Sequence, residues 1–495
     1  MTTSTSNALA DGPARADLAA PAASPSRAMA APAREVPRTL WSRFIILMLC
    51  LAVVTTTLAF GTVHAWALAV FQMSAGLVFA LWVVDAWRTG VLRVSRNPLQ
   101  LPLLGLFIVG LVQLLPLGGA GALSADPYAT RLVLAELAGL LVYFAAALAF
   151  LDSPGRLKLL ARLVVVFGFL LAVYGLMQHF VNPATIYFLR EPKQAQPFGP
   201  YINRHHFAGY MELALAMPLG LLFAGAVARE RMPLYAFAAG IMAVALVMTN
   251  SRGGMISMVC EVMFLALAAA AARRRGHDEE ERAGGSSRVR AALMRVGLAF
   301  GLLVVVLFGA LYFGGEAALG RFVGTVNSED PTTGRAHFWQ GTAGIIKDHP
   351  LLGTGLGSFA SAYPPYDTAN GAYRLEQAHN DYLQVFSDGG VVSGLLGLLF
   401  VALLFRAAFR RMQSHDRLRR GVALGALAGC AGVLVHSFFD FTLHTTANAL
   451  MFLLLAALAT ADDRVAEHGE GSHRRRHRRH RRRPDAAPEK EGVAA

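Results

Sequence analysis

Apolar runs long enough to cross a bilayer recur along this 495-residue chain. The hydrocarbon core of a bilayer is about 30 Å thick, which a helix of about 20 apolar residues spans. Backbone groups in lipid must find their hydrogen bonds inside each segment, so helices are the expected spanning elements. The sequence therefore predicts an all-α polytopic membrane protein with about 12 transmembrane helices, over residues 44–61, 65–86, 97–116, 131–151, 160–180, 207–227, 233–249, 254–272, 293–313, 387–405, 420–438 and 445–461.

Basic residues mark one set of the loops between these runs. Loops on the cytoplasmic side of a membrane are enriched in Lys and Arg. An even number of spans places both termini on this same side. The loops assigned to the cytoplasm carry Arg88, Arg93 and Arg96; Arg156, Lys158 and Arg162; Arg229 and Arg231; Arg273, Arg274, Arg275, Arg288 and Arg290; and Arg406, Arg410, Arg411, Arg417, Arg419 and Arg420.

The formal net charge is +13, yet the composition argues against a nucleic-acid-binding protein. Hydrophobic residues make up 55% of the chain and charged residues only 16%, against about 25% charged in soluble domains. No recognition module accompanies the basic loops and the tail "GSHRRRHRRHRRR" (471–483). We expect the tail to contact anionic membrane lipids, and we expect no nucleic-acid partner.

A long loop, residues 314–386, separates the ninth and tenth runs on the periplasmic side. Several aromatic residues within it predict an ordered, partly helical loop. The stretch "TGRAHFWQGTAGIIKDHP" predicts an amphipathic helix that ends before Pro350, with Thr332 or Thr333 as its cap. The alternate glycines of "GTGLGSF" (353–359) predict a tight turn, because no strand precedes them as a nucleotide-binding loop would require.

Polar side chains from five segments are predicted to gather at the outer, periplasmic ends of the helices. An Arg in a short turn between apolar helices is costly unless it has a partner. The planar guanidinium makes paired hydrogen bonds to phosphate, so these segments predict an anion site. They contribute Asn203, Arg204, His205 and His206; Asn250, Ser251 and Arg252; Arg335 and His337; His379 and Asn380; and His436, Asp440 and His444.

Simpler structural explanations compete at each position. Arg252 could extend its charge to the membrane interface, Arg335 could be a solvated helix residue, and His379 could cap a helix. Packing or interfacial roles are expected for four further histidines, which are His205, His206, His436 and His444. The sequence predicts no metal site and no cofactor, because helical H-x-x-x-H and C-x-x-C signatures are absent. The three cysteines lie in apolar runs and give no evidence of a disulfide: Cys50, Cys260 and Cys430.

The ordered motifs "NRHHFAGY", "TNSRGG", "GRAHFW…HPLLGTGLGSF" and "HNDYLQVFSDGG" resemble those of the O-antigen ligase and polymerase superfamily. The resemblance covers about residues 203–405. It implies an inner-membrane glycosyltransferase of the GT-C class, which takes a glycan from undecaprenyl diphosphate at the periplasmic face. In ligases the acceptor is lipid A-core. In polymerases of O-antigen or exopolysaccharide it is another lipid-linked glycan, and in a third branch it is a protein hydroxyl.

The resemblance also implies roles for individual residues. His379 corresponds to the essential catalytic histidine, and Arg252 and Arg335 correspond to the arginines that bind the donor diphosphate. Beside these matched positions, the polar residues at the same face that are candidates for binding donor or acceptor are Asn203, Arg204 and Asn380.

Two positions depart from the ligase pattern. Trp339 stands where ligases have Leu, and Ser393 stands where they favour Gly, Thr or Tyr. These differences leave the chemistry intact but weaken the choice of a ligase over a polymerase.

The chemistry of the residues fits such a transferase independently. No ATP is available outside the cytoplasm, so the donor must already be activated, as a glycosyl diphosphate is. Arginines would stabilise the leaving diphosphate, and a histidine with a near-neutral pKa would take the acceptor proton. Attack opposite the leaving group inverts the anomeric centre without a metal.

The predicted function is therefore O-antigen ligase-type transfer. The alternatives are a polymerase, a protein O-oligosaccharyltransferase and, outside enzymes, a polysaccharide transporter or flippase. Glu136, Glu212 and Glu261 are intramembrane acids that a transporter could use. Transporters, however, usually place polar sites near the midplane on broken helices.

The chain divides by composition into five parts. Residues 1–42 and the basic tail 462–495 are expected to be disordered and cytoplasmic. Residues 43–206 form an N-terminal transmembrane bundle. The O-antigen ligase-like core, 207–405, includes the periplasmic loop, and residues 406–461 supply the last transmembrane helices.

Overall fold

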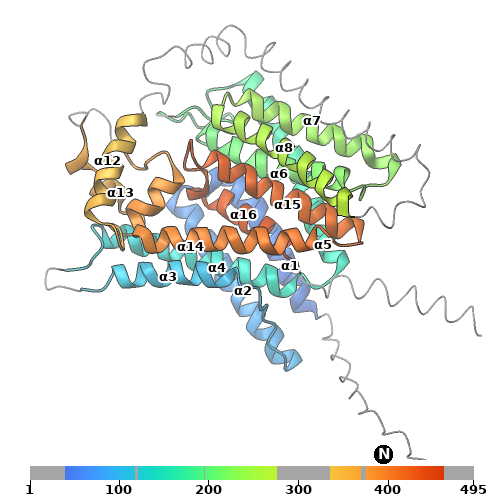
Figure 1. Cartoon of the computed structure of the whole chain (residues 1–495), viewed down its shortest axis with the longest axis horizontal. Coiled ribbons are helices and arrows are strands. Elements are labelled where there is room, and N and C mark those ends of the chain that lie inside the picture. The colour runs from blue at the N-terminus through green and yellow to red at the C-terminus, as the bar shows by residue number, and fades with distance from the viewer. Residues whose placement is uncertain (1–38, 117–120, 194, 276–334, 369–374, 462–495) are drawn as a thin grey trace, which may run out of the picture. The chain divides into compact units, whose positions relative to one another are not determined.

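The computed structural model describes residues 39–116, 121–193, 195–275, 335–368 and 375–461. Its regular elements over these ranges are helices (Figure 1). The long ones are α1 (Leu40–Leu58), α2 (Ala65–Thr89), α3 (Gln100–Gln113), α4 (Pro127–Phe150), α5 (Pro154–Val181), α6 (Arg204–Phe223), α7 (Met232–Met248), α8 (Arg252–Arg275), α12 (Arg335–Asp348), α14 (Asp381–Arg411), α15 (Arg417–His436) and α16 (Thr446–Ala459). The short ones are α13 (Phe359–Ala362), η1 (Phe60–Thr62), η2 (Arg229–Arg231), η4 (Pro364–Tyr366) and η5 (Thr442–His444).

The all-α prediction is confirmed for the described part of the chain, which contains 8 helices long and apolar enough to cross a membrane. They are Leu40–Leu58, Ala65–Thr89, Pro127–Phe150, Pro154–Val181, Arg204–Phe223, Arg229–Met248, Asp381–Arg411 and Arg417–His436. Two predicted spans are shorter than expected, because α3 and α16 have 14 residues each. The predicted span 254–272 lies within α8, and the predicted span 293–313 lies outside the described residues. The total of twelve stays a prediction.

Helix α6 is the centre of the bundle, and every residue of its most apolar 18-residue stretch is buried. It packs against α5, α7, α8 and α15. The closest approach is to α15, where a Cβ on Gly220 would lie 2.3 Å from the Gly425 Cα. Helices in lipid gain little from the hydrophobic effect, so small residues that let backbones approach supply much of the packing energy. These glycines set the position of α15 against α6.

Helix α14 begins earlier than predicted and carries a break. The predicted span started at residue 387, whereas the helix starts at Asp381, so the long loop ends six residues sooner. Gly390 interrupts it with φ 63°, where a Cβ would lie 2.2 Å from the Leu351 carbonyl oxygen. The predicted domain boundary between residues 405 and 406 falls in α14 after the Gly390 break, and it stays a prediction.

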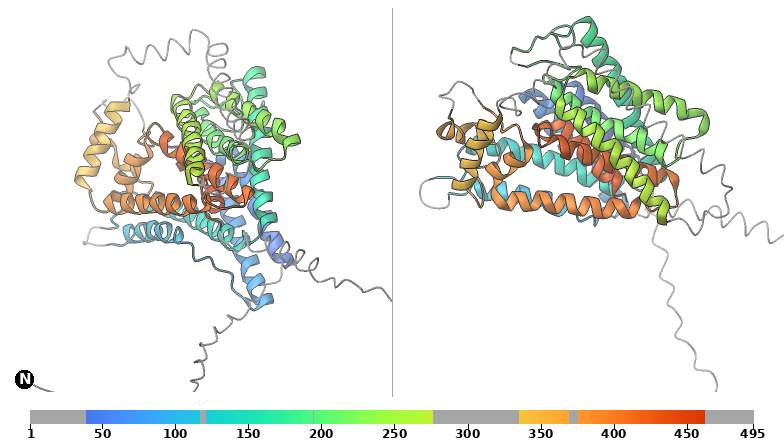
Figure 2. Two further views of the ribbon diagram at one scale, coloured as in Figure 1. Left: turned by 45° about the vertical axis from the view of Figure 1, so that its right-hand side comes forward. Right: turned by 45° about the horizontal axis from the view of Figure 1, so that its top comes forward.

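The two local predictions within the long loop are confirmed. Helix α12 ends at Asp348, before Pro350, although its predicted threonine caps lie outside the described residues. The glycine-rich stretch is a tight turn, since Gly353, Gly355 and Gly357 all have positive φ. The Gly355 N–H donates to the Asp388 carbonyl at 3.0 Å. The turn thereby fixes the start of α14 beside α12, as both views of Figure 2 show.

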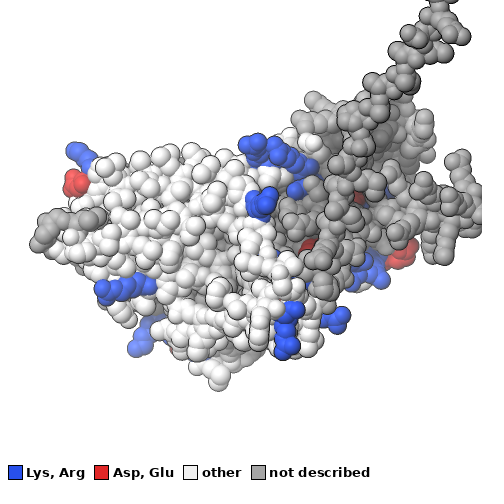
Figure 3. All heavy atoms as spheres, turned by 90° about the horizontal axis from the view of Figure 1, so that it is seen from below, with Lys and Arg blue, Asp and Glu red and all other residues white. Residues whose placement is uncertain are grey.

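Large apolar side chains cover much of the outside of the bundle. On α2 alone, Met73 is 67% exposed and Trp87 is 80% exposed. Figure 3 shows a broad surface without charged side chains, with Lys and Arg spaced widely around it. Exposed apolar area on this scale marks a membrane-facing surface, which agrees with a multi-pass membrane protein.

The contact between α6 and α15 gives a stability prediction. Gly425→Ala should lower the free energy of unfolding by about 1–3 kcal/mol, because a methyl group there must push against the α6 backbone. Thermal unfolding in detergent would measure it. The control is Gly397→Ala in α14, where a Cβ meets nothing within 4 Å; it should be neutral or stabilising, because alanine favours the helix by about 1 kcal/mol. Equal unfolding temperatures for the two variants would contradict this view of the packing.

Candidate functional site

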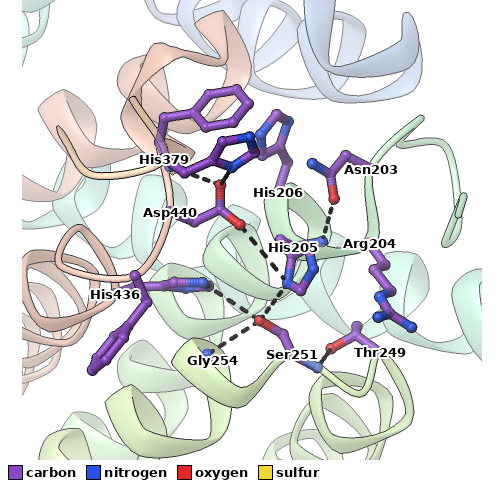
Figure 4. A network of polar contacts seen from close by, with 12 residues as sticks. Asn203, Arg204, His205, His206, Thr249, Ser251, Gly254, His379, His436 and Asp440 are labelled. Carbon is purple, nitrogen blue, oxygen red and sulfur yellow. Dashed lines mark hydrogen bonds and ion pairs between the residues drawn. The ribbon is translucent and has the colours of Figure 1, made fainter. Parts of the chain in front are cut away.

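A polar cluster forms where α6, α8 and α14 begin, against the turn 437–445 that joins α15 to α16 (Figure 4). The sequence predicted that five segments would meet at one face. Each of the five supplies a member to this cluster, which comprises His205, Ser251, Arg335, His379, His436 and Asp440. The prediction of a shared polar face is thus reproduced by the fold.

Asp440 lies at the centre of the cluster, with its side chain 2% exposed. One carboxylate oxygen, Oδ1, lies 3.5 Å from the His379 Nδ1. The other, Oδ2, lies 3.5 Å from Nη2 of Arg335 and 3.9 Å from the His205 Nδ1. Burial raises the pKa of Asp440, but its contacts with His379, His205 and Arg335 outweigh it and hold that pKa well below its ordinary range. Asp440 is therefore an ionised, buried counter-charge.

His379 has an unusual backbone conformation, with φ 52°. The two residues that follow, Asn380 and Asp381, hold the backbone in this conformation. Asn380 caps α14 by accepting from the Tyr382 and Leu383 N–H groups at 3.0 and 3.1 Å, and it donates to the Phe438 carbonyl at 3.1 Å. The Asp381 N–H donates to the Ser437 carbonyl at 2.9 Å. The "HND" sequence thus ties the start of α14 to the turn that carries Asp440.

The His379 ring is partly open to solvent, with 30% of the side chain exposed. Nδ1, which faces Asp440, is buried. The ring packs edge-on against Phe441, with centroids 4.9 Å apart, and near Phe338 of α12. A ring held by a carboxylate on one nitrogen is suited to exchange a proton at the other, Nε2.

A second carboxylate secures the same region. The Asp381 Oδ1 lies 2.7 Å from Nδ1 of His444, and the Ser437 hydroxyl donates to its Oδ2 at 2.7 Å. Burial lowers the pKa of His444, but the hydrogen bond and charge of Asp381 outweigh it, so that pKa is raised. His444 and Asp381 thus form a charge-assisted link between α14 and η5.

The start of α6 contributes four consecutive polar residues. Asn203 caps the helix by accepting from the His205 N–H at 2.9 Å. The Arg204 N–H donates to the Gln196 carbonyl at 2.9 Å, and its guanidinium donates to the Gln196 side chain. The His206 Nδ1 lies 3.0 Å from the Thr445 hydroxyl. In the view of Figure 4, Arg204 lies on the side of His205 away from His379.

Arg252 is the first residue of α8. It stands between Ser251, which belongs to the cluster, and Gly253, which lies against the His436 ring. The Ser251 hydroxyl lies 2.9 Å from the His205 Nδ1 and 3.5 Å from the His436 Nε2. A Cβ on Gly253 would lie 2.8 Å from the His436 ring, and one on Gly254 would lie 3.0 Å from the Ala208 Cβ. The glycines that follow Arg252 therefore let α8 approach α15 and α6 closely, which places a half-buried Arg252 beside the cluster.

The cluster continues inward toward two buried acids. The His436 Nδ1 lies 2.8 Å from the Glu212 Oε1 of α6. Glu261 of α8 is fully buried, and among the described residues neither of its carboxylate oxygens has a hydrogen-bond partner. The third intramembrane acid, Glu136, accepts from the Thr446 hydroxyl at 2.7 Å. These acids therefore lie inside a helical bundle.

Sequence reasoning identified the participating segments but missed their centre. It treated Asp440 as one polar residue among several, and it expected packing roles for His205, His206, His436 and His444. In the structure each of these histidines has a polar partner. The available signal was the spacing of His436, Asp440 and His444, which places three titratable groups on one short turn.

Metal ligation has no evident site in the described part of the chain. No group of three or more His, Cys, Asp or Glu side chains there is arranged to hold a metal ion. Cys50, Cys260 and Cys430 are all described and all free.

The comparisons with known proteins give a match to one family model over part of the chain. Residues 237–399 match the family model described as O-antigen ligase. The matched segment contains Arg252, Arg335, His379 and Asn380, whereas Asp440 and the start of α6 lie outside it. No curated protein matches the chain significantly.

The position of Asp440 gives a test of the cluster. Asp440→Asn should lower the free energy of unfolding by about 3–5 kcal/mol, because His379 and Arg335 lose a buried counter-charge. A carboxylate with a lowered pKa stabilises the fold above its unfolded pKa, so wild type should keep this contribution above about pH 4. The control is Asp416→Asn, since Asp416 caps α15 at an exposed position and Asn is an equally good cap. Equal thermal unfolding of both variants at pH 7 would contradict the role assigned to Asp440.

Proposed function

We propose that this chain, whose residues 237–399 match the O-antigen ligase family model, transfers a glycan from undecaprenyl diphosphate to an acceptor hydroxyl at the periplasmic face. The proposed reaction inverts the anomeric centre and needs no metal. The proposed acceptor is lipid A-core, as in the ligases.

The observation that carries this proposal is the His379–Asp440–Arg335 cluster next to Arg252. A histidine with one nitrogen facing a buried carboxylate lies within one cluster with a guanidinium. Arg252 follows Ser251, which contacts the same cluster. A base and anion-binding groups at one face are what transfer from a lipid diphosphate requires.

We assign the base to His379. Its Nε2 removes the proton of the acceptor hydroxyl while that oxygen forms a bond to the anomeric carbon. The bond from this carbon to the diphosphate oxygen breaks, and its electron pair stays on undecaprenyl diphosphate. Asp440 stabilises the imidazolium that results, because its carboxylate lies 3.5 Å from Nδ1. The role is that of a positioning residue with a compensating charge.

We assign the diphosphate to Arg252 and Arg335, with support from helix termini. The helices α6, α8 and α14 all begin at the cluster. A helix N-terminus carries about half a positive charge, which favours phosphate. Arg335 is already positioned by the α15–α16 turn, through Asp440 and the Phe439 carbonyl. Asn203 and Asn380 would act mainly as caps that position their neighbours, and Arg204 would face donor or acceptor.

A polymerase of the same superfamily is the second candidate. The two departures from the ligase pattern, Trp339 and Ser393, favour it. Trp339 lies on α12, and Ser393 is buried in α14 just after the Gly390 break. Deletion in the native host separates the two. Loss of polymer from lipid A-core with polymer retained on the carrier lipid indicates a ligase, and a shift to single repeat units indicates a polymerase.

We also propose the membrane arrangement. The chain would have twelve transmembrane helices of the GT-C type, with both termini in the cytoplasm and the cluster at the periplasmic face. The core 207–405 would carry the chemistry between the bundle 43–206 and the helices of 406–461, and the tails 1–42 and 462–495 would stay cytoplasmic.

The role of His379 as base predicts a loss of turnover. His379→Ala should lower the transfer rate of purified protein by about 10²–10⁴-fold, with donor affinity little changed. Arg252→Lys and Arg335→Lys should weaken donor binding, because a point charge does not reproduce the guanidinium fork. The measurements are single-turnover transfer and binding of the lipid-linked donor. A His379→Ala enzyme that keeps more than about a third of wild-type turnover would exclude His379 as the base.

Metal independence can be tested directly. Arginine charge replaces the divalent cation in the proposed mechanism, so transfer should continue in excess chelator. A loss of about tenfold or more that magnesium or manganese restores would show that the donor site has been misassigned.

A further inference from the structure

A cavity lined by both polar and apolar residues opens beside the cluster and is not used by the proposed chemistry. Its volume is about 470 Å³, within the range of about 300–1,000 Å³ typical of small-molecule sites. Its walls come from the end of α5, the loop between α5 and α6, and the turn between α7 and α8. The lining includes His179, Glu191, Gln196, Phe198, Arg204 and Asn250.

The walls of the cavity are held by contacts of their own. Phe198 stacks on His179 with ring centroids 5.2 Å apart, and it packs on Phe207 of α6 at 4.7 Å. The Gly199 N–H donates to the Gln178 side chain at 3.0 Å. Gln196 is bound to both the backbone and the guanidinium of Arg204. The loop is therefore fixed to the helices, so the cavity is part of the folded structure.

The groups around the cavity match the chemistry of sugars. A carboxylate, a carboxamide and a guanidinium supply acceptors and donors to neighbouring hydroxyls, as Glu191, Gln196 and Arg204 can. The partly exposed ring of His179, which stacks on the buried Phe198, offers an apolar surface for a sugar face. No single charge dominates this lining, which favours a polar neutral ligand over a second phosphate.

The cavity lies on the donor side of the reaction centre. Arg204 and Asn250 line it, and each precedes a cluster residue, His205 or Ser251. Asn250 is also two residues before Arg252. In Figure 4, Arg204 and His379 lie on opposite sides of His205, and His379 is where the acceptor hydroxyl would be deprotonated. An inverting attack places the acceptor and the diphosphate on opposite sides of the anomeric carbon. The remaining sugars of the donor chain must therefore extend away from the line that joins acceptor and diphosphate.

We propose that this cavity binds the sugar residues of the donor glycan that follow the one attached to the diphosphate. The inference rests on the proposed function and adds to it a subsite for the donor chain. The cavity would select donors by their sugars, while the arginines bind the diphosphate that all such donors share.

The test compares two lipids on purified full-length protein. One is undecaprenyl diphosphate alone, and the other is the same lipid carrying the glycan from the native host. Wild type should bind the glycan-bearing lipid more tightly. Arg204→Gln should weaken that binding by about tenfold and leave the affinity for undecaprenyl diphosphate within about twofold, because the variant keeps Arg252 and Arg335, which are the proposed diphosphate ligands. Ala195→Trp, which fills the cavity, should have the same effect.

The matched control is Lys193→Gln, which removes one positive charge from the same loop at an exposed position outside the lining. It should leave both affinities unchanged. Equal weakening of both lipids by Arg204→Gln would assign Arg204 to the diphosphate and overturn the proposal. An Arg204→Gln variant in which only the KM for the acceptor is raised would also overturn the proposal. Equal affinity of wild type for the glycan-bearing lipid and for the bare lipid would overturn it as well. A wild type that binds the glycan selectively but transfers nothing would contradict the proposed function and leave the subsite standing.

Discussion

The buried carboxylate of Asp440 is the interaction on which the arrangement of the site depends. Three cationic or ionisable side chains from separate elements, His205, Arg335 and His379, lie within 4 Å of its oxygens. An ionised carboxylate in a membrane protein is costly without such partners. The cost makes the arrangement specific, because α6, α12 and α14 must each present a side chain to the same short turn. The turn after α15 therefore organises residues that lie far apart in the sequence.

Close helix packing makes that convergence possible. Gly220 and Gly425 bring α15 against α6, and Gly253 brings α8 against His436. Larger side chains at these positions would separate the helices and move the turn away from its partners. The glycines near Arg252 thus have a structural explanation that does not involve phosphate contact. They determine where α8 begins, and the first residue of that helix is the proposed phosphate ligand.

The sequence predicted much of this fold because membrane helices have a strong signal. Apolar runs gave the helices of the described regions, and loop charges gave a topology in which five polar segments share one face. Boundaries were less accurate. Asn380 and Asp381 look like loop residues, yet their hydrogen bonds to the α15–α16 turn extend α14 to Asp381. The central role of Asp440 was missed for a similar reason: a single acid gains its importance from partners that only the tertiary structure supplies.

The charge balance of the site explains why an anionic substrate would complete it. Asp440 offsets the positive charge of Arg335, but Arg252 and the starts of three helices lie at the same face. Positive potential left over in a partly buried site attracts a multivalent anion and becomes more effective as water is excluded. A lipid diphosphate brings negative charge at the membrane surface, where the helices begin. As the glycosyl bond breaks, the charge on its leaving oxygen grows, so this potential stabilises the transition state more than the bound donor.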